Sequence, residues 1–94
     1  MEIKLTDKQK FIGKLLLNHK EKGITAYEFI KTYKKDLEKH NIDTQKINSV
    51  NATLASLSSK ELASKNKIAY NDKMATNYKP LELLDKVINK EENK

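Results

Sequence analysis

One face of a predicted helix over residues 44–60 carries amides, hydroxyls and a methyl group but no charge. Its members are Gln45, Asn48, Ser49, Ala52, Ser56 and Ser59. An ordinary solvated face would repeat the lysine and glutamate that cover the rest of a chain in which 34% of residues are charged. Amide and hydroxyl groups both donate and accept hydrogen bonds. We therefore expect this face to lie against another molecule.

The other face of the same helix is apolar. Apolar side chains recur every three or four positions along it, at Ile47, Val50, Leu54 and Leu57. This spacing places them on one side of a helix and commits that side to a core. The core must therefore position the uncharged face.

The charge of the chain favours a polyanionic partner. Its formal net charge is +6 and its pI is near 9.4, and a positive field concentrates phosphate-bearing ligands near a protein. All 19 basic residues are lysine. Lysine lacks the planar fork with which arginine grips guanine, so sequence reading would depend on amides, hydroxyls and methyls. An AT-rich genome is the alternative reason for the missing arginine.

Catalytic, metal and cofactor sites find no support in the sequence. The chain has no cysteine, and its two glycines cannot form a glycine-rich phosphate loop. His19 and His40 have no second ligand at metal-binding spacing and are expected to stabilise the C-termini of helices. We recognise no nucleophile beside a base with an orienting partner. We expect a protein that is not an enzyme and that binds no metal or cofactor.

No targeting or membrane-spanning segment is recognisable. The N-terminus lacks a basic segment followed by an apolar run and a cleavage site, and no run of about 18 apolar residues occurs. A length of 94 residues corresponds to one domain. We expect a cytoplasmic protein with a single domain over 1–94, in which 5–79 form the core and 80–94 a closing helix and frayed tail.

Capping residues predict where three helices begin. Thr6 with Gln9 and Thr25 with Glu28 each form the pattern of a capping box. Asp43 is a suitable N-cap for the third helix. The three helices are expected over about 6–19, 26–39 and 44–60.

Gly13 and Pro80 mark two further points of the predicted fold. Glycine inside a helix costs roughly 1 kcal/mol relative to alanine, so we expect a neighbouring helix to pack closely at Gly13. Pro80 stops the strand before it and suits the first turn of a closing helix over 81–88.

A period of two on both sides of a turn predicts an antiparallel ribbon. Larger side chains alternate with small or polar ones at Ile68 and Tyr70 before the turn, and at Met74, Thr76 and Tyr78 after it. Asn71, Asp72 and Lys73 form the predicted turn. Two strands are not stable alone in water, so we expect the ribbon to fold back over the second and third helices. Ile24 is a candidate for brief pairing with it.

The order helix, helix, helix, two-stranded ribbon, helix resembles the winged helix-turn-helix domains of bacterial, phage and plasmid regulators, broadly the MarR-like group. The resemblance covers residues 5–79. Segment 47–57, INSVNATLASL, resembles a recognition helix, and segment 68–78, IAYNDKMATNY, resembles a wing. The implied fold is mainly α (α+β): a three-helix helix-turn-helix core, a two-stranded β-hairpin wing and a C-terminal helix.

The resemblance implies sequence-specific binding of double-stranded DNA by a small transcriptional regulator. A B-form major groove admits one helix, whose N-terminal half faces the base edges. Asn48 or Gln45 would then pair with adenine, and the Ala52 methyl would contact thymine methyls, which predicts an A·T-rich site. The implied base-reading residues are Gln45, Asn48, Ser49, Ala52 and Ser56.

The resemblance also implies contacts to the DNA backbone or minor groove from the helix margins and from a wing over 66–78. Such contacts fix register without reading sequence. The implied set is Thr44, Lys46, Lys60, Lys65, Lys67, Asn71 and Lys73. The arginine that often enters the minor groove from a wing is missing, so Lys73 would have to serve there.

Three roles remain open from the sequence. The first is a regulator of a phage, plasmid or other mobile element, given the small size and the lack of a sensor domain. It would bind as a homodimer through helix 81–88, although that helix is equally suited to cap the monomer core. The second is an accessory factor for replication or transfer of a plasmid or mobile element. The third is a protein-interaction module that binds no DNA.

Two clusters on the second predicted helix have alternative interpretations. Tyr27, Phe29 and Tyr33 are expected in the core, and stacking on single-stranded bases is the alternative. Lysines also form a basic flank, which is either a solvated face or a functional patch: Lys31, Lys34, Lys35 and Lys39.

Overall fold

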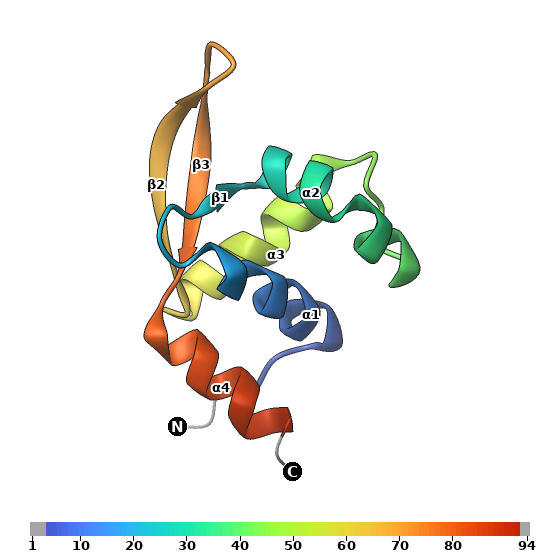
Figure 1. Cartoon of the computed structure of the whole chain (residues 1–94), viewed down its shortest axis with the longest axis vertical. Coiled ribbons are helices and arrows are strands. Elements are labelled where there is room, and N and C mark those ends of the chain that lie inside the picture. Colours follow the sequence, from blue (N-terminus) through green and yellow to red (C-terminus); the bar gives the residue numbers. More distant parts are fainter. Residues whose placement is uncertain (1–3, 93–94) are drawn as a thin grey trace.

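The computed structural model describes residues 4–92 and has three helices packed together, a projecting ribbon and a closing helix (Figure 1). The elements are α1 (Asp7–Leu16), the short 3-10 helix η1 (Leu17–His19), β1 (Ile24–Thr25), α2 (Ala26–Lys39), α3 (Ile47–Ser59), β2 (Ala63–Tyr70), β3 (Lys73–Pro80) and α4 (Glu82–Glu92). The tip of the β2–β3 ribbon and α4 lie at opposite ends of the long axis. The order of elements that the sequence predicts is confirmed.

Local hydrogen bonds start α1 and α2 where the sequence predicts. The Thr6 hydroxyl accepts from the Gln9 backbone N–H at 3.1 Å, and the Gln9 Oε1 accepts from the Thr6 N–H at 2.9 Å, which completes a capping box. At α2 the Thr25 hydroxyl accepts from the Glu28 N–H at 3.2 Å. The Glu28 carboxylate, however, accepts a hydrogen bond from Tyr70 on the ribbon.

The start of α3 differs from the prediction. The helix begins at Ile47, and its N-cap residue makes no capping hydrogen bond through its side chain. Asp43 does not cap it, because the Asp43 Oδ1 accepts from the Gln45 N–H at 2.8 Å and closes a local turn. The Thr44 hydroxyl also donates to Glu38 Oε1 at 3.3 Å. Residues 44–46 therefore belong to the loop between α2 and α3.

The sheet has three strands in the order β1–β3–β2. Along the ribbon, Ala63 lies opposite Pro80 and Tyr70 lies opposite Lys73. β1 pairs antiparallel with β3, with Ile24 opposite Tyr78, so the expected pairing of Ile24 is confirmed. The predicted two-stranded ribbon thus gains a third strand at its base, which ties it to the helical core.

The turn of the ribbon is shorter than predicted. Asn71 and Asp72 both have left-handed backbone conformations, with φ of 48° and 63°. Two consecutive left-handed residues form the hairpin turn whose twist matches that of the flanking strands. Lys73 is not part of this turn, because it pairs with Tyr70 as the first residue of β3.

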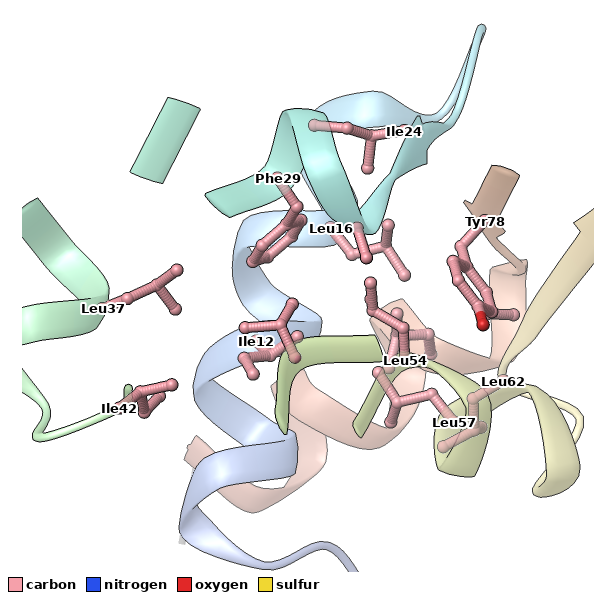
Figure 2. Close-up of a cluster of buried hydrophobic side chains, with 14 of the residues drawn as sticks. Ile12, Leu16, Ile24, Phe29, Leu37, Ile42, Leu54, Leu57, Leu62 and Tyr78 are labelled. Carbon is pink, nitrogen blue, oxygen red and sulfur yellow. The ribbon is translucent and has the colours of Figure 1, made fainter. Parts of the chain in front are cut away.

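The core lies among the helices and the base of the sheet (Figure 2). Val50, Leu54 and Leu57 are fully buried, as their spacing predicts, whereas Ile47 at the start of α3 is half-buried. Burying a leucine or valine side chain contributes about 1.5–3 kcal/mol. The other largest fully buried side chains come from α1, α2 and α4 and from the residue that directly precedes β2: Ile12, Leu16, Phe29, Leu37, Leu84, Ile88 and Leu62.

α4 closes the core against α1. Leu84 and Ile88 are buried, and a Cβ added to Gly13 would meet the Cδ1 atoms of Ile88 at 3.1 Å and of Leu84 at 3.2 Å. The close helix approach expected at Gly13 is therefore confirmed. The helix 81–88 proposed as a dimer seam thus caps the monomer core with one face.

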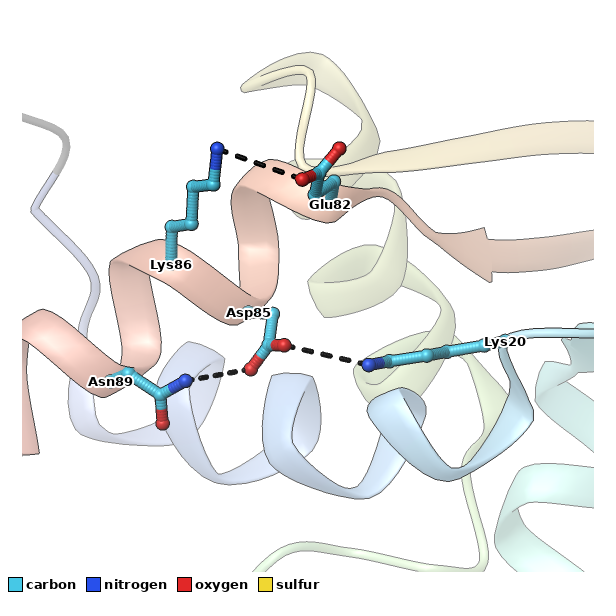
Figure 3. Close-up of polar contacts among 5 residues, drawn as sticks. All are labelled: Lys20, Glu82, Asp85, Lys86 and Asn89. Atoms are coloured by element: carbon cyan, nitrogen blue, oxygen red, sulfur yellow. Dashed lines mark hydrogen bonds and ion pairs between the residues drawn. The ribbon is translucent and has the colours of Figure 1, made fainter.

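The polar contacts of α4 are exposed (Figure 3). Lys20 Nζ lies 3.4 Å from Asp85 Oδ2, and Lys86 Nζ lies 3.7 Å from Glu82 Oε1. Exposed pairs of this kind contribute about 0–1 kcal/mol, so apolar packing holds α4 in place. α4 extends to Glu92, beyond the helix 81–88 that the sequence predicts, and the Asn89 amide donates to Asp85 Oδ1 at 2.8 Å.

Candidate nucleic-acid interface

Asn48 and Ala52 lie on an exposed strip of α3. They are four residues apart, which places them one above the other on a helix, and both are exposed, as is Ser59 further along. Within the described residues the Asn48 amide has no hydrogen-bond partner. Its donor and acceptor groups are both available to an external molecule.

Ser49 and Ser56 lie at the margin between α3 and α1 and are half-buried. Lys8 Nζ donates to the Ser49 hydroxyl at 2.5 Å, and Gln9 Nε2 donates to the Ser56 hydroxyl at 3.0 Å. The Ser56 hydroxyl in turn donates to the backbone carbonyl of Thr53 at 2.6 Å. These two serines are therefore already engaged in the folded chain, and Lys8 is placed beside the strip instead.

Gln45 is exposed but lies in the loop before α3. The five predicted base-reading residues are thus not one surface: Asn48 and Ala52 share the strip, Ser49 and Ser56 face α1, and Gln45 precedes the helix.

The ribbon divides its lysines between two faces. Side chains directly opposite each other in an antiparallel pair point to the same face. Lys67 lies opposite Thr76 and Lys65 opposite Tyr78, which packs into the core beside α3, so both lysines share the face of the ribbon toward α3. Lys73 is exposed at the tip and lies on the opposite face with Tyr70.

A cleft of about 170 Å³ separates the first half of α3 from the ribbon. Asn48 and Asn51 line it from α3, and Lys67 and Met74 line it from the ribbon. Met74 is 65% exposed, which makes it the most exposed large apolar side chain of the described residues. The cleft therefore combines two amides and one ammonium group with several apolar side chains, to which α2 also contributes Ala26 and Tyr27.

Asn51 was not among the predicted site residues. The Tyr78 hydroxyl donates to Asn51 Oδ1 at 3.0 Å, and Tyr78 is only 2% exposed. Burial raises the pKa of Tyr78 above its ordinary value of 10.0, so the hydroxyl keeps its proton at neutral pH. The sequence signal that could have identified Asn51 is its position three residues after Asn48, on the neighbouring row of the same helix.

The ribbon is braced against the start of α2. The Tyr70 hydroxyl donates to Glu28 Oε1 at 2.5 Å, and this hydrogen bond raises the pKa of Tyr70. The rings of Tyr27 and Tyr70 stack with centroids 5.7 Å apart and planes inclined by 11°. The expectation that Tyr27 lies in the core is wrong, because it is 50% exposed, whereas Phe29 is fully buried and Tyr33 is half-buried.

The predicted phosphate-binding residues of α3 are spread along the helix. Lys46 precedes its first turn and Lys60 follows its last, so about 20 Å of helix separates them. Thr44 is half-buried and bonded to Glu38, and Asn71 is exposed in the hairpin turn. Lys46 is thus at the end of α3 that contributes to the cleft, and Lys60 is at the far end.

The two histidines make contacts within the fold. His19 Nε2 lies 2.6 Å from the Tyr33 hydroxyl, and the rings of Phe11 and His40 stack with centroids 3.7 Å apart. Burial lowers the pKa of His19 below its ordinary value of 6.5. No three His, Cys, Asp or Glu side chains of the described residues are grouped so that they could hold a metal ion. None of the described helices has the length and apolar character needed to cross a membrane.

Comparison with known proteins supports the fold. No model of a known family matches the chain, and no curated protein sequence matches it. A solved structure, the crystal structure of a PadR family transcriptional regulator from Eggerthella lenta DSM 2243, matches with a TM-score of 0.65 and 17% sequence identity. The match covers 92% of this chain and 72% of that one. The fold class is therefore that of a winged helix, and the comparison does not single out the MarR-like group.

Proposed function

We propose that this protein binds double-stranded DNA sequence-specifically and acts as a small transcriptional regulator. The observation that carries the proposal is the unpartnered amide of Asn48, which lies in the first turn of α3 and opens into a cleft shared with Lys67. An amide that can both donate and accept beside a cationic ribbon matches a nucleic-acid groove, where base edges lie between two phosphate backbones.

The exposed strip of α3 is the proposed base-reading surface. A major groove about 12 Å wide admits one helix, and the N-terminal residues of a recognition helix reach the base edges. Asn48 can form a bidentate pair with adenine, and the exposed Ala52 methyl can contact a thymine methyl. We therefore propose an A·T-rich site, read mainly from the first two turns of α3.

Lysines around the strip are the proposed phosphate contacts. Lys46 lies at the start of α3, and Lys65 and Lys67 lie on the ribbon face toward α3. Lys73 lies at the tip on the other face, where it is placed for the backbone or the minor groove at the edge of the complex. Phosphate contacts of this kind supply affinity that does not depend on sequence.

The test is selection of bound sequences from random duplexes, followed by binding measurements on the selected site. Asn48→Ala is expected to lower affinity for that site by about 1–3 kcal/mol, or roughly 5- to 150-fold, while binding to an unrelated duplex stays the same. Asn18→Ala is the matched control, because Asn18 is an exposed asparagine in η1 that does not line the cleft. Failure to enrich any motif at moderate salt would refute sequence-specific binding.

A homodimer through α4 is part of the proposal. Leu81 and Leu83 are 40% and 41% exposed, while Leu84 and Ile88 fill the monomer core. The outward leucines are available to a second copy, and a two-fold dimer on DNA requires two recognition helices about 34 Å apart, one turn of DNA. Equilibrium sedimentation of the protein, alone and with its selected site, tests this arrangement.

The biological setting is proposed from the sequence. We propose a cytoplasmic protein of a phage, plasmid or bacterium, related to the MarR-like group. An accessory factor for replication or transfer would bind DNA in the same way. Reporter assays on the selected site distinguish this role from control of transcription. A protein-interaction module instead predicts no enriched motif.

A further inference from the structure

We propose that Asn51 is a second base-reading residue and that the buried Tyr78 restricts it to keto bases, guanine or thymine. This inference rests on the proposed DNA-binding function. It adds a residue that α3 presents to the cleft and a positioning residue that lies behind it, in the core.

Asn48 and Asn51 differ in one contact, the hydrogen bond that Asn51 accepts from Tyr78. Both line the cleft from α3, with Asn51 three residues after Asn48. The amide oxygen of Asn51 accepts a hydrogen bond from the Tyr78 hydroxyl, 3.0 Å away. The Asn51 Nδ2 group has no partner within the described residues, as is true of the whole Asn48 amide. Because its oxygen is held toward Tyr78, Asn51 presents its N–H groups to the cleft, whereas the Asn48 amide can turn to present either its donor or its acceptor.

The anchor of this contact is rigid. Tyr78 is 2% exposed and lies on β3, paired with β1 on one side and with β2 on the other. Its hydroxyl is protonated at neutral pH and remains a donor to Asn51, because the ordinary tyrosine pKa is 10.0 and burial raises the pKa of Tyr78 further. The Asn51 amide is thus held in one orientation before any ligand arrives, which reduces the cost of ordering it on binding.

The orientation of the Asn51 amide implies a base preference, because the bases present different donors and acceptors in the major groove. Guanine presents two acceptors, N7 and O6, and thymine presents the acceptor O4. Adenine places an N6–H donor beside N7, and a bidentate pair with it needs an amide oxygen as well as an amide N–H. Cytosine presents the N4–H donor. An amide that is held with its N–H groups toward the base edges, and its oxygen toward Tyr78, therefore favours guanine or thymine over adenine and cytosine.

Replacement of Tyr78 by phenylalanine removes the hydroxyl and frees the Asn51 oxygen. The amide can then turn and form the bidentate pair with adenine. The expected result is a change of preference rather than a general loss of affinity: one position of the site shifts from guanine or thymine toward adenine, by about two- to tenfold in relative affinity. A purely structural role of Tyr78 would weaken all duplexes equally.

The experiment measures binding of the wild-type protein, Tyr78→Phe and Asn51→Ala to four duplexes that differ in one base pair of the selected site. Each position of the site is scanned in turn. The wild type is expected to prefer guanine or thymine at one position, Asn51→Ala to lose that preference, and Tyr78→Phe to shift it toward adenine. Tyr70→Phe is the matched control, because it also removes a hydroxyl from the ribbon but leaves Asn51 bonded to Tyr78.

Asn51→Asp keeps the inference testable if Tyr78→Phe does not fold. Its carboxylate has only acceptors, so the same position is expected to shift toward cytosine or adenine. An unchanged preference in Asn51→Ala would overturn the inference while leaving the proposed function intact. So would a Tyr78→Phe protein that folds and keeps the wild-type preference. A wild-type protein that selects no sequence would overturn both.

Discussion

Gly23 occupies a position where the structure tolerates no side chain. Its φ of +72° lies in the left-handed region, and a Cβ added to it would lie 2.7 Å from the Tyr78 carbonyl oxygen and 2.4 Å from the Asn77 Nδ2 atom. The Tyr78 carbonyl is part of β3, so it cannot move without shifting the strand. Gly23→Ala is therefore expected to disturb the place where β1 joins the sheet.

The expected loss of stability has two parts. The left-handed conformation costs a residue with a Cβ about 1–2 kcal/mol, and forcing extra atoms into a packed site costs about 1–3 kcal/mol. Together they amount to about 2–5 kcal/mol, a large share of the 5–15 kcal/mol typical of a domain. For a chain of this length the corresponding fall in Tm is about 10–30 °C.

Gly13→Ala is the matched control. A Cβ at Gly13 meets only the ends of the flexible Ile88 and Leu84 side chains, at 3.1 and 3.2 Å, and alanine gains up to about 1 kcal/mol inside a helix. We expect its stability to remain within about 1 kcal/mol of the wild type. Urea unfolding followed by circular dichroism measures both variants. Equal stabilities of the two would refute the reasoning, because they would mean that β3 yields as easily as a leucine side chain.

Two further predictions concern charge. Lys67→Ala is expected to weaken binding to all duplexes and to lower the slope of log affinity against log salt by about one, whereas Lys35→Ala, exposed on α2 and absent from the cleft, should leave the slope unchanged; fluorescence anisotropy at several salt concentrations decides. Because burial lowers the pKa of His19 in the folded state below 6.5, the unfolded chain binds the proton more readily, so the His19 contribution is complete above pH 6.5 and falls below it. Urea midpoints of wild type and His19→Gln across this pH range measure the difference, and an NMR pKa of His19 at or above 6.5 would contradict it.

Features that depend on neighbouring residues could be predicted from the sequence. The capping box of Thr6 and Gln9 and the hairpin turn at Asn71 and Asp72 form through contacts within a few residues, so their residue types determine them. The start of α3 could not be predicted in the same way. Asp43 is equally suited to capping a helix and to closing a local turn, and the turn occurs next to a hydrogen bond from Thr44 to Glu38 on the preceding helix.

The candidate site could be predicted only in part, because some of its residues depend on contacts between elements that are distant in the chain. The helical period shows that Asn48 and Ala52 lie opposite the apolar face, and the structure places both on the surface. The helical period does not show that α1 lies along one margin of this face and that Lys8 hydrogen-bonds to Ser49, because these two residues are 41 positions apart in the chain. A face read from periodicity is therefore wider than the face that packing leaves exposed.

The same argument explains why the exposed strip and the lysines belong to different elements. A lysine on the strip would bring a flexible point charge to the base edges, where it could contact the acceptors of guanine but could not form the donor–acceptor pair with adenine that an oriented amide forms. Asn51 can be oriented only by a group from outside α3, and Tyr78 reaches it from β3 across 27 positions of the chain. The ribbon then has two separate tasks: its base orients a reader from within the core, and its outer half presents Lys67 and Lys73 to solvent. Substitutions at the base should therefore change which sequence is bound, and substitutions toward the tip should change how tightly any sequence is bound.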